Sequence, residues 1–295
     1  MFTGSSVALL TPMTRQADGS TQLDLDAWDR LLTWHANAGT QAVVVGGTTG
    51  ESGTLDHEEY VQLLTHAIER LKGKMWVMAG TGSPSTAHTI ARTRLAASLG
   101  ADMALVVTPA YNRPSQRGLL AHYRAVADAS DIPIMLYNVP GRTAVDLLPE
   151  TAVALAEHAK IVAIKEAVPD MDRIATLVQA GLAVFSGDDP SFAQALRQGA
   201  QGVVSVAANI VPQTVAELCR LAQTNDWVAV REQDAQLADL YTFLGVETNP
   251  VPAKWLLAEM GGCAHAIRLP LVELDSKYHE RGHAILDRLR PVPPQ

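Results

Sequence analysis

Short runs of apolar residues, rich in valine and isoleucine, recur eight times in the first two thirds of the chain. They lack the alternation of a half-exposed strand and are too short to favour helices. They therefore predict strands that are covered on both faces, as in a parallel sheet. The predicted strands are residues 6–10, 42–46, 75–79, 103–107, 132–137, 161–164, 182–185 and 202–206.

Each run is followed by apolar residues at helical spacing, for example within residues 28–35. Asp56 and Ser85 are typical helix N-caps, and Gly100 is a typical residue to follow a helix end. Eight strand–helix units over about 220 residues predict an α/β fold of the (β/α)8 TIM-barrel type. A doubly wound open sheet is the alternative, but it usually has fewer strands and a GxGxxG motif after the first, which this chain lacks.

The strand pattern stops after Pro212, and only helical periodicity continues. Apolar residues at helical spacing run from Val215 to Leu289, and the proline-rich segment 249–252 interrupts them. We therefore expect a catalytic barrel domain over residues 1–224 and a helical C-terminal domain over residues 225–295.

The composition is typical of a globular enzyme, with 47% hydrophobic and 18% charged residues. The formal net charge is -8 and no Lys/Arg-rich run occurs, so no nucleic-acid partner is expected. No apolar stretch approaches the roughly 18 to 20 residues of a membrane span, and the first residues do not resemble a signal peptide. These features favour a cytoplasmic protein with no membrane partner. Cys219 and Cys263 belong to no CxxC pair, so neither a disulfide framework nor a zinc ribbon is expected.

Lys165 directly follows the apolar run 161–164. Burying an ammonium without a partner is costly, whereas a neutral amine is a nucleophile that forms imines with carbonyl substrates. The alternative is a strand-end lysine whose ammonium reaches water along its stem. We expect the other lysines to lie in solvent or at helix ends: Lys72, Lys74, Lys160, Lys254 and Lys277.

Polar side chains follow several other predicted strands. The carboxyl ends of the strands meet on one face of such a barrel, and that face carries the active site. The segments expected there are 47–51, 108–113, 137–143 and 186–189. Their hydroxyl, guanidinium and carboxylate groups can bind anions or move protons. The presence of these groups around Lys165 favours a catalytic role for this lysine over a structural one.

Several of these motifs together resemble the dihydrodipicolinate synthase family, a branch of the pyruvate-dependent class I aldolases. The motifs are Gly47-Thr48-Thr49-Gly50-Glu51-Ser52, Tyr137-Asn138-Val139-Pro140-Gly141-Arg142-Thr143, Ile164-Lys165-Glu166-Ala167, Ser186-Gly187-Asp188-Asp189 and Asn249-Pro250-Val251-Pro252-Ala253-Lys254. The resemblance covers nearly the whole chain, from Phe2 to Pro270. N-acetylneuraminate lyases are similar at the lysine and the threonine turn but lack the Arg-Thr ending.

The resemblance implies a role for each residue near the lysine. Lys165 would form an imine with pyruvate. The turn at Thr48 and Thr49 would bind the pyruvate carboxylate through backbone N–H groups and hydroxyls. Tyr137 would move protons in a relay with Thr48 and with Tyr111, which in this family enters the site of a neighbouring subunit. The alternative for the turn at Thr48 and Thr49 is a structural connection whose conformation is set by its glycines. The alternative for Tyr111 is a half-buried aromatic residue.

Further roles follow from the same resemblance. Arg142 would clamp the carboxylate of the second substrate, aspartate semialdehyde, with its bidentate guanidinium. The alternative for Arg142 is a surface ion pair. Gly187 and Val204 would line the pocket near the imine, and Glu51 would fix the turn rather than perform chemistry.

The implied reaction condenses pyruvate with L-aspartate 4-semialdehyde to 4-hydroxy-tetrahydrodipicolinate, which feeds diaminopimelate and lysine synthesis. The lysine imine is itself the electron sink, so no metal or organic cofactor is expected. The resemblance also implies a homo-oligomer, with dimers that share active sites within a tetramer. Three alternatives stay open: a related aldolase or lyase acting on a sialic or 2-keto-3-deoxy sugar acid, a zinc hydrolase, and a non-catalytic keto-acid binding protein.

The zinc alternative rests on residues 279–283, which match the HExxH signature. A helix would place His279 and His283 on one face. Gly282 weakens that helix, however, and few residues follow that could supply a third ligand. A solvated final helix is the favoured interpretation.

The sequence also differs from family members that are inhibited by lysine. Pro84 and His88 stand where those members use an asparagine and a glutamate to hold the lysine ligand. Ala110 replaces a tyrosine that covers the ligand, and Tyr60 replaces a histidine, whereas Ser52 and His57 agree with the inhibited pattern. Loss of a carboxylate leaves a cationic ligand without its counter-charge. Weak or absent inhibition by lysine is therefore expected.

Overall fold

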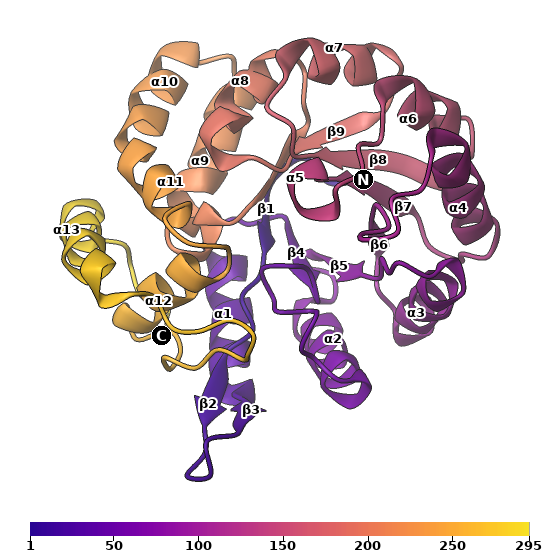
Figure 1. Cartoon of the computed structure of the whole chain (residues 1–295). Helices are drawn as coiled ribbons and strands as arrows, with labels where there is room; N and C mark the ends of the chain where they lie inside the picture. Colours follow the sequence, from indigo (N-terminus) through magenta and orange to yellow (C-terminus); the bar gives the residue numbers. More distant parts are fainter. Residues whose placement is uncertain (295) are drawn as a thin grey trace.

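The eight apolar runs form the eight parallel strands of a closed barrel, in the order β1-β10-β9-β8-β7-β6-β5-β4 (Figure 1). The computed structural model describes residues 1–294. Its barrel strands are β1 (Gly4–Ala8), β4 (Ala42–Val45), β5 (Trp76–Gly80), β6 (Met103–Val107), β7 (Ile134–Asn138), β8 (Ile161–Glu166), β9 (Ala183–Ser186) and β10 (Gly202–Ser205). The predicted TIM-barrel fold is confirmed, and the strand bounds differ from the predicted ones by a few residues at most.

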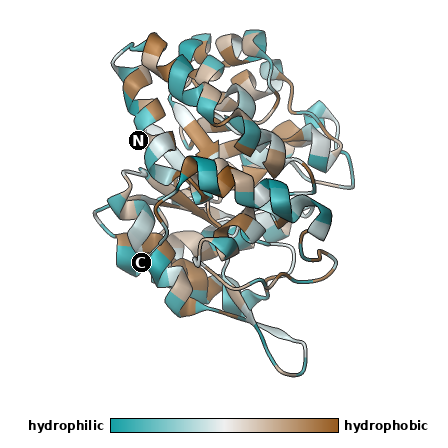
Figure 2. Ribbon diagram, turned by 90° about the vertical axis from the view of Figure 1, so that its left-hand side faces the viewer, coloured by the Kyte–Doolittle hydropathy of each residue, from teal (hydrophilic) through white to brown (hydrophobic). Residues whose placement is uncertain are grey.

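Helices follow the strands and, apart from the short α5 at the barrel mouth, cover the outside of the barrel (Figure 1). They are α1 (Leu25–Asn37), α2 (His57–Leu71), α3 (Thr86–Leu99), α4 (Gln116–Asp128), α5 (Pro140–Thr143), α6 (Pro149–Ala156), α7 (Met171–Gln179), α8 (Phe192–Arg197) and α9 (Pro212–Gln223), with short 3-10 turns η1 (Asp189–Ser191) and η2 (Ala207–Asn209). The expected caps are present: Asp56 forms a capping box with Glu59, Ser85 caps α3, and Gly100 ends α3 with φ 99°. Figure 2 shows hydrophobic residues along the strands and hydrophilic residues on the outer helical turns.

Side chains alternate along each strand, so every second residue points into the barrel. On β8, Ala163 and Lys165 share the inward side, whereas Ile164 belongs to the outer layer beneath the helices. The interior is filled by apolar side chains of different sizes, among them Val44, Met135 and Phe185. The interior is therefore a packed core, with room for chemistry only at its carboxyl end.

A short hairpin was not predicted. Strands β2 (Met13–Arg15) and β3 (Thr21–Leu23) pair antiparallel and form a hairpin that projects from the barrel in both views (Figures 1 and 2). Each strand has only three residues, too few for a periodic pattern to stand out from loop sequence.

The chain continues with helices α10 (Trp227–Gln236), α11 (Ala238–Leu244), α12 (Val251–Glu259) and α13 (His279–Leu289), and a 3-10 turn η3 (Ser276–Tyr278). One buried hydrophobic cluster extends from Val7 of the barrel to Leu256 and Ile285 of these helices. The domain boundary at residue 224 stays a prediction, and Gln295 lies outside the described residues. Within residues 1–294, no helix combines the length and hydrophobicity needed to cross a membrane.

The prediction for Lys254 was wrong. Its side chain is not in solvent but buried within α12, where its ammonium pairs with the buried carboxylate of Glu51. Glu51 belongs to the turn after β4, 203 positions earlier in the sequence. Nothing in the local sequence indicates such a partner, because the pairing arises only from the packing of α12 against the barrel.

Candidate active site

Lys165 lies inside the carboxyl end of the barrel, one residue before the end of β8. Its side chain is 5% exposed, and it is paired in register with Tyr137 on β7 and Phe185 on β9. The Lys165 Nζ atom lies 4.4 Å from the centroid of the Tyr137 ring. The predicted nucleophile and the predicted proton carrier are therefore direct neighbours.

A cavity of about 210 Å3 opens above these two side chains. Six of the eight predicted site residues line it: Thr48, Thr49, Tyr137, Arg142, Lys165 and Gly187. The other lining residues are Ala8, Val44, Gly47, Leu105, Val139, Ala167, Asp188, Val206 and Asn249. The structure thus assembles most of the predicted site around one lysine.

The turn after β4 presents anion-binding groups to the cavity. Within residues 1–294, the backbone N–H groups of Thr48 and Thr49 have no intramolecular acceptor, whereas those of Gly50 and Glu51 are used inside the turn. Thr49 is buried, and its Oγ1 accepts a hydrogen bond of 2.9 Å from Nδ2 of Asn249. Two free N–H groups beside threonine hydroxyls suit a small carboxylate.

Gly187 is required by its closeness to the lysine. A Cβ atom at this position would lie 2.8 Å from Cε and 3.1 Å from Cγ of Lys165. Val204, the other residue expected near the imine, is buried deeper in the barrel interior. Val206, two residues further along, lines the cavity in its place, because β10 ends at Ser205 and the chain turns there.

Arg142 lies in the short helix α5 at the mouth of the cavity. It is exposed, and its Nη2 donates to the backbone oxygen of Asn249 over 3.3 Å rather than to a carboxylate. A second, outer cavity of about 440 Å3 adjoins the first and shares Thr48, Arg142 and Asn249 with it. The guanidinium therefore stands where the inner cavity opens outward, free to bind an anion.

Tyr111 does not join the cavity of its own chain. It is 94% exposed, and its backbone is in the left-handed region with φ 71°. A fully exposed aromatic side chain held by a strained backbone is unusual for a residue with only a packing role. The half-buried position considered for it is wrong.

A buried polar network next to the lysine was not predicted. Glu166, the residue after Lys165, accepts hydrogen bonds from Nε of Arg173 at 2.8 Å and from Nδ2 of Asn138 at 3.0 Å. Arg173 and Asn138 also bind Asp146. Burial raises the pKa of Glu166, and the Arg173 charge opposes this shift. The sequence signal was a glutamate inside an apolar strand.

Asp189 is a second buried carboxylate near the lysine. Its Oδ2 accepts hydrogen bonds from the backbone N–H groups of Val206 at 2.9 Å and Ala207 at 2.8 Å. Burial raises its pKa, whereas these hydrogen bonds and the Lys165 charge lower it. Asp189 therefore fixes the backbone of Val206 at the cavity wall.

The HExxH residues lie far along the chain, in α13. His279 stacks on Trp255 at 4.7 Å between ring centroids, and Nε2 of His283 lies 2.7 Å from Oε2 of Glu259. A Cβ at Gly282 would meet the Trp255 ring at 2.2 Å, so this glycine allows α13 to pack closely on α12. In the described part of the chain, no group of three or more His, Cys, Asp or Glu residues has a metal-binding arrangement.

An arginine lies beside one of the positions matched to the lysine-inhibition site. Tyr60 is buried, and the Arg92 guanidinium lies 4.5 Å from its ring centroid. An arginine at this place would repel a cationic ligand. Weak inhibition by lysine stays a prediction, and this contact supports it.

Comparison with known proteins gives a consistent result. Residues 1–289 match the model of the dihydrodipicolinate synthetase family. A 4-hydroxy-tetrahydrodipicolinate synthase of Stenotrophomonas maltophilia is 49% identical over 281 residues, 94% of this chain and 93% of the relative. The enzyme of that name from Acidithiobacillus ferrooxidans is 46% identical over 295 residues, 99% of this chain and 100% of the relative. The crystal structure of the chloride-inhibited dihydrodipicolinate synthase from Acinetobacter baumannii in complex with pyruvate has a TM-score of 0.94 at 43% identity, covering 98% of this chain and 99% of that one.

Substitution of Gly187 by alanine tests the packing around Lys165. The added methyl group would displace the lysine side chain, and such overpacking costs about 1 to 3 kcal/mol. We expect imine formation with pyruvate, measured by borohydride trapping, to slow by about 5- to 150-fold, the factor to which that range of free energy corresponds. Gly245→Ala is the matched control, since a Cβ there meets only Thr242 O at 3.6 Å. Equal trapping rates in both variants would contradict the assigned role of Gly187.

Proposed function

The chain belongs to the dihydrodipicolinate synthetase family, and we propose how the residues of its cavity carry out the reaction. It is a lyase that condenses pyruvate with L-aspartate 4-semialdehyde to give 4-hydroxy-tetrahydrodipicolinate, in lysine and diaminopimelate biosynthesis. The observation that carries our proposal is the buried Lys165 amine, which lies between Tyr137 and Gly187 at the base of the cavity. We also propose a cytoplasmic location, because the reaction belongs to amino-acid biosynthesis.

Lys165 supplies the nucleophile. Its neutral amine attacks the keto carbon of pyruvate, and loss of water gives a protonated imine. The imine draws electrons from C3, so a C3 proton leaves and an enamine forms. The enamine attacks the aldehyde carbon of the second substrate, which re-forms the lysine imine, and the aldehyde oxygen takes up a proton to become a hydroxyl group. The amino group of that substrate then attacks the imine carbon, which closes the ring and releases the lysine.

The turn after β4 holds the pyruvate carboxylate. The free N–H groups of Thr48 and Thr49 point donors to the cavity, and the Asn249 hydrogen bond fixes the Thr49 side chain. This placement brings the keto carbon toward the amine and lowers the entropic barrier of the first step. Tyr137, next to the amine, carries protons to and from the intermediates. Its partner in the proposed relay is the Thr48 hydroxyl, since Thr48 lines the same cavity.

Arg142 binds the second substrate. Aspartate semialdehyde carries a carboxylate. Among residues 1–294 the Arg142 guanidinium has no carboxylate partner, and it stands where the two cavities meet. A bidentate contact there would hold the aldehyde over the enamine carbon. The same contact would make the enzyme prefer aspartate semialdehyde over aldehydes that have no carboxylate to bind Arg142. The aldehydes used by sugar-acid aldolases belong to that second group.

Tyr111 completes the relay across a subunit interface. Its own chain leaves the side chain almost fully exposed, so the ring is free to reach a second copy. We therefore place each active site at the interface of a dimer, with dimers paired in a tetramer. Two sites form across one contact, because a two-fold interface exchanges the same residue in both directions.

The first test of this mechanism is chemical trapping. Pyruvate and borohydride should add a reduced pyruvyl group to Lys165, because reduction makes the transient imine permanent. Peptide mass spectrometry locates the adduct. Lys165→Ala should abolish the label. Lys160→Ala, at a half-buried lysine just before β8 whose ammonium donates to the backbone oxygen of Asp131, should leave it unchanged. A label on another lysine would refute the assignment.

Arg142→Ala tests the binding of the second substrate. Loss of a charge-assisted contact that leaves the substrate carboxylate unpaired costs about 2 to 5 kcal/mol. We expect kcat/KM for aspartate semialdehyde to fall by at least about thirtyfold, while borohydride trapping with pyruvate stays within twofold, as in the exposed control Arg117→Ala. Equal losses in both half-reactions would show that Arg142 is structural.

Subunit mixing tests the shared site. Tyr111→Phe and Lys165→Ala proteins should each have little activity. A hybrid dimer contains one site with an intact Lys165 and an intact Tyr111 from the partner, so mixing should restore part of the activity. Native mass spectrometry verifies that subunits exchange. Exchange without recovery would place Tyr111 outside the neighbouring site.

A further inference from the structure

The pyruvate-binding turn is connected to the C-terminal helices by a buried ion pair. Oε1 of Glu51, at the end of the turn, accepts a hydrogen bond from Nζ of Lys254 in α12. The two side chains are 1% and 4% exposed. The other carboxylate oxygen of Glu51 accepts the backbone N–H of Arg268 over 3.1 Å. Both oxygens of one carboxylate are thus bound to groups from the C-terminal part of the chain.

The turn needs external support because its backbone is strained. Glu51 has φ 57°, a left-handed conformation that is uncommon for a residue with a side chain. Gly50 is held between β1 and the turn, since a Cβ there would lie 2.9 Å from the Leu9 oxygen. Strained positions persist when surrounding contacts over-determine them. The contacts of the Glu51 carboxylate hold this strained backbone in place. Glu51 lies three residues after Thr48 and two after Thr49, whose N–H groups have no acceptor within residues 1–294.

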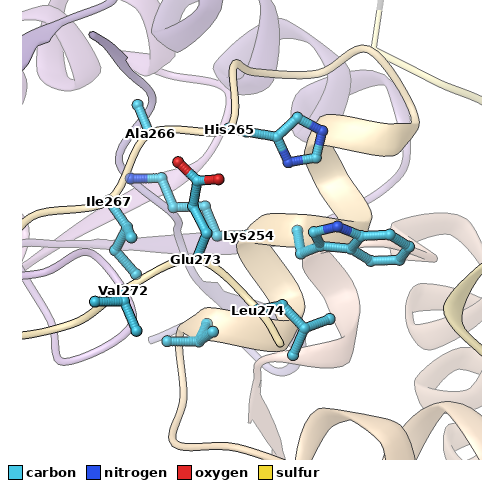
Figure 3. Close-up of a pocket in the computed structure, with 9 residues that line it drawn as sticks. Lys254, His265, Ala266, Ile267, Val272, Glu273 and Leu274 are labelled. Atoms are coloured by element: carbon cyan, nitrogen blue, oxygen red, sulfur yellow. The ribbon is translucent and has the colours of Figure 1, made fainter. Parts of the chain in front are cut away.

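The surroundings of Lys254 leave little space for anything else. Figure 3 shows its side chain running from α12 toward the segment that carries Ala266 and Ile267. The cavity beside it has a volume of only about 10 Å3, room for no more than about one water molecule. Burial lowers the pKa of Lys254, and the Glu51 charge opposes this shift. With both side chains present, the free space beside Lys254 thus admits about one water molecule.

Stability alone does not explain two charges at this place. Apolar residues of similar volume often serve a fold as well as a buried ion pair does. An ion pair with hydrogen bonds adds direction, because it fixes the position of both groups. The neighbouring contact between Asn249 and Thr49, at 2.9 Å, joins the same turn to the segment that leads into α12. Two directed contacts, one from Thr49 and one from Glu51, thus link the turn to α12 and to the segment that leads into it.

We propose that Lys254 and Glu51 are positioning residues for the keto-acid substrate: their buried pair sets the orientation of the Thr48–Thr49 turn, and α12 is thereby part of the active site. The inference rests on the proposed role of this turn in binding the pyruvate carboxylate. Neither residue touches substrate. The pair acts through the backbone N–H groups, so its loss should weaken pyruvate binding more than it slows the later steps.

The test compares Lys254→Met, Glu51→Gln and the double variant that carries both changes. Each single variant leaves one buried charge without its partner, so both should lose thermal stability. The double variant removes both charges, and its melting temperature should return most of the way to that of the parent. Half-saturation of borohydride trapping by pyruvate should still require about tenfold more pyruvate in the double variant, because the directed contact is gone. Its kcat should change less than about threefold.

Lys277→Met is the matched control, because Lys277 pairs with Asp275 on the surface of the same C-terminal region. It should match the parent in both measurements. A double variant that recovers stability and binds pyruvate as the parent does would overturn the inference, as would a double variant that fails to fold. Trapping in the parent at Lys165 is measured in the same series, so a failure of the proposed function shows as no adduct in any protein.

Discussion

The alternation of side chains along β8 is the constraint on which the site depends. Lys165 points into the barrel and Glu166 points out of it, although the two are adjacent in sequence. The Lys165 amine therefore does not face the Glu166 carboxylate. Arg173 and Asn138 bind that carboxylate on the other side of the strand. A shift of one residue would exchange the two and place a carboxylate in the cavity. The outer network fixes this register from the rear, and Gly187 leaves space for the lysine in front.

The barrel and most of the cavity could be predicted because their signals are local. Apolar runs define the strands, and residues that follow the strands must meet at one face. Val204 shows where this local reasoning stops, because the family resemblance and not the strand pattern placed it near the imine. In the structure Val204 lies in the barrel interior, and Val206, after the end of β10, lines the cavity. The hairpin of β2 and β3 escaped prediction because its strands are too short for periodicity.

The pairing of Glu51 with Lys254 could not be predicted for a different reason. A buried lysine and an exposed one have the same local sequence context on a short apolar helix, and the partner lies 203 residues away. Burial of both groups is decided by how α12 packs against the barrel, which is a property of the whole fold. The same holds for Arg173, whose carboxylate partners come from two other segments. The partners of buried polar groups are thus the hardest part of a site to predict from sequence, because they come from distant segments.

The two cavities suggest a physical reason for the order of the proposed reaction. The inner cavity of about 210 Å3 is bounded by buried groups with fixed contacts, and the outer cavity of about 440 Å3 is open and bordered by the exposed Arg142. Arg142 lines both cavities, so an aldehyde bound to it would stand between the outer cavity and the amine. This arrangement favours binding of the keto acid and imine formation before binding of the aldehyde. Rigid inner contacts suit the step that needs an exact approach to one amine, whereas an exposed guanidinium can adjust as the second substrate enters.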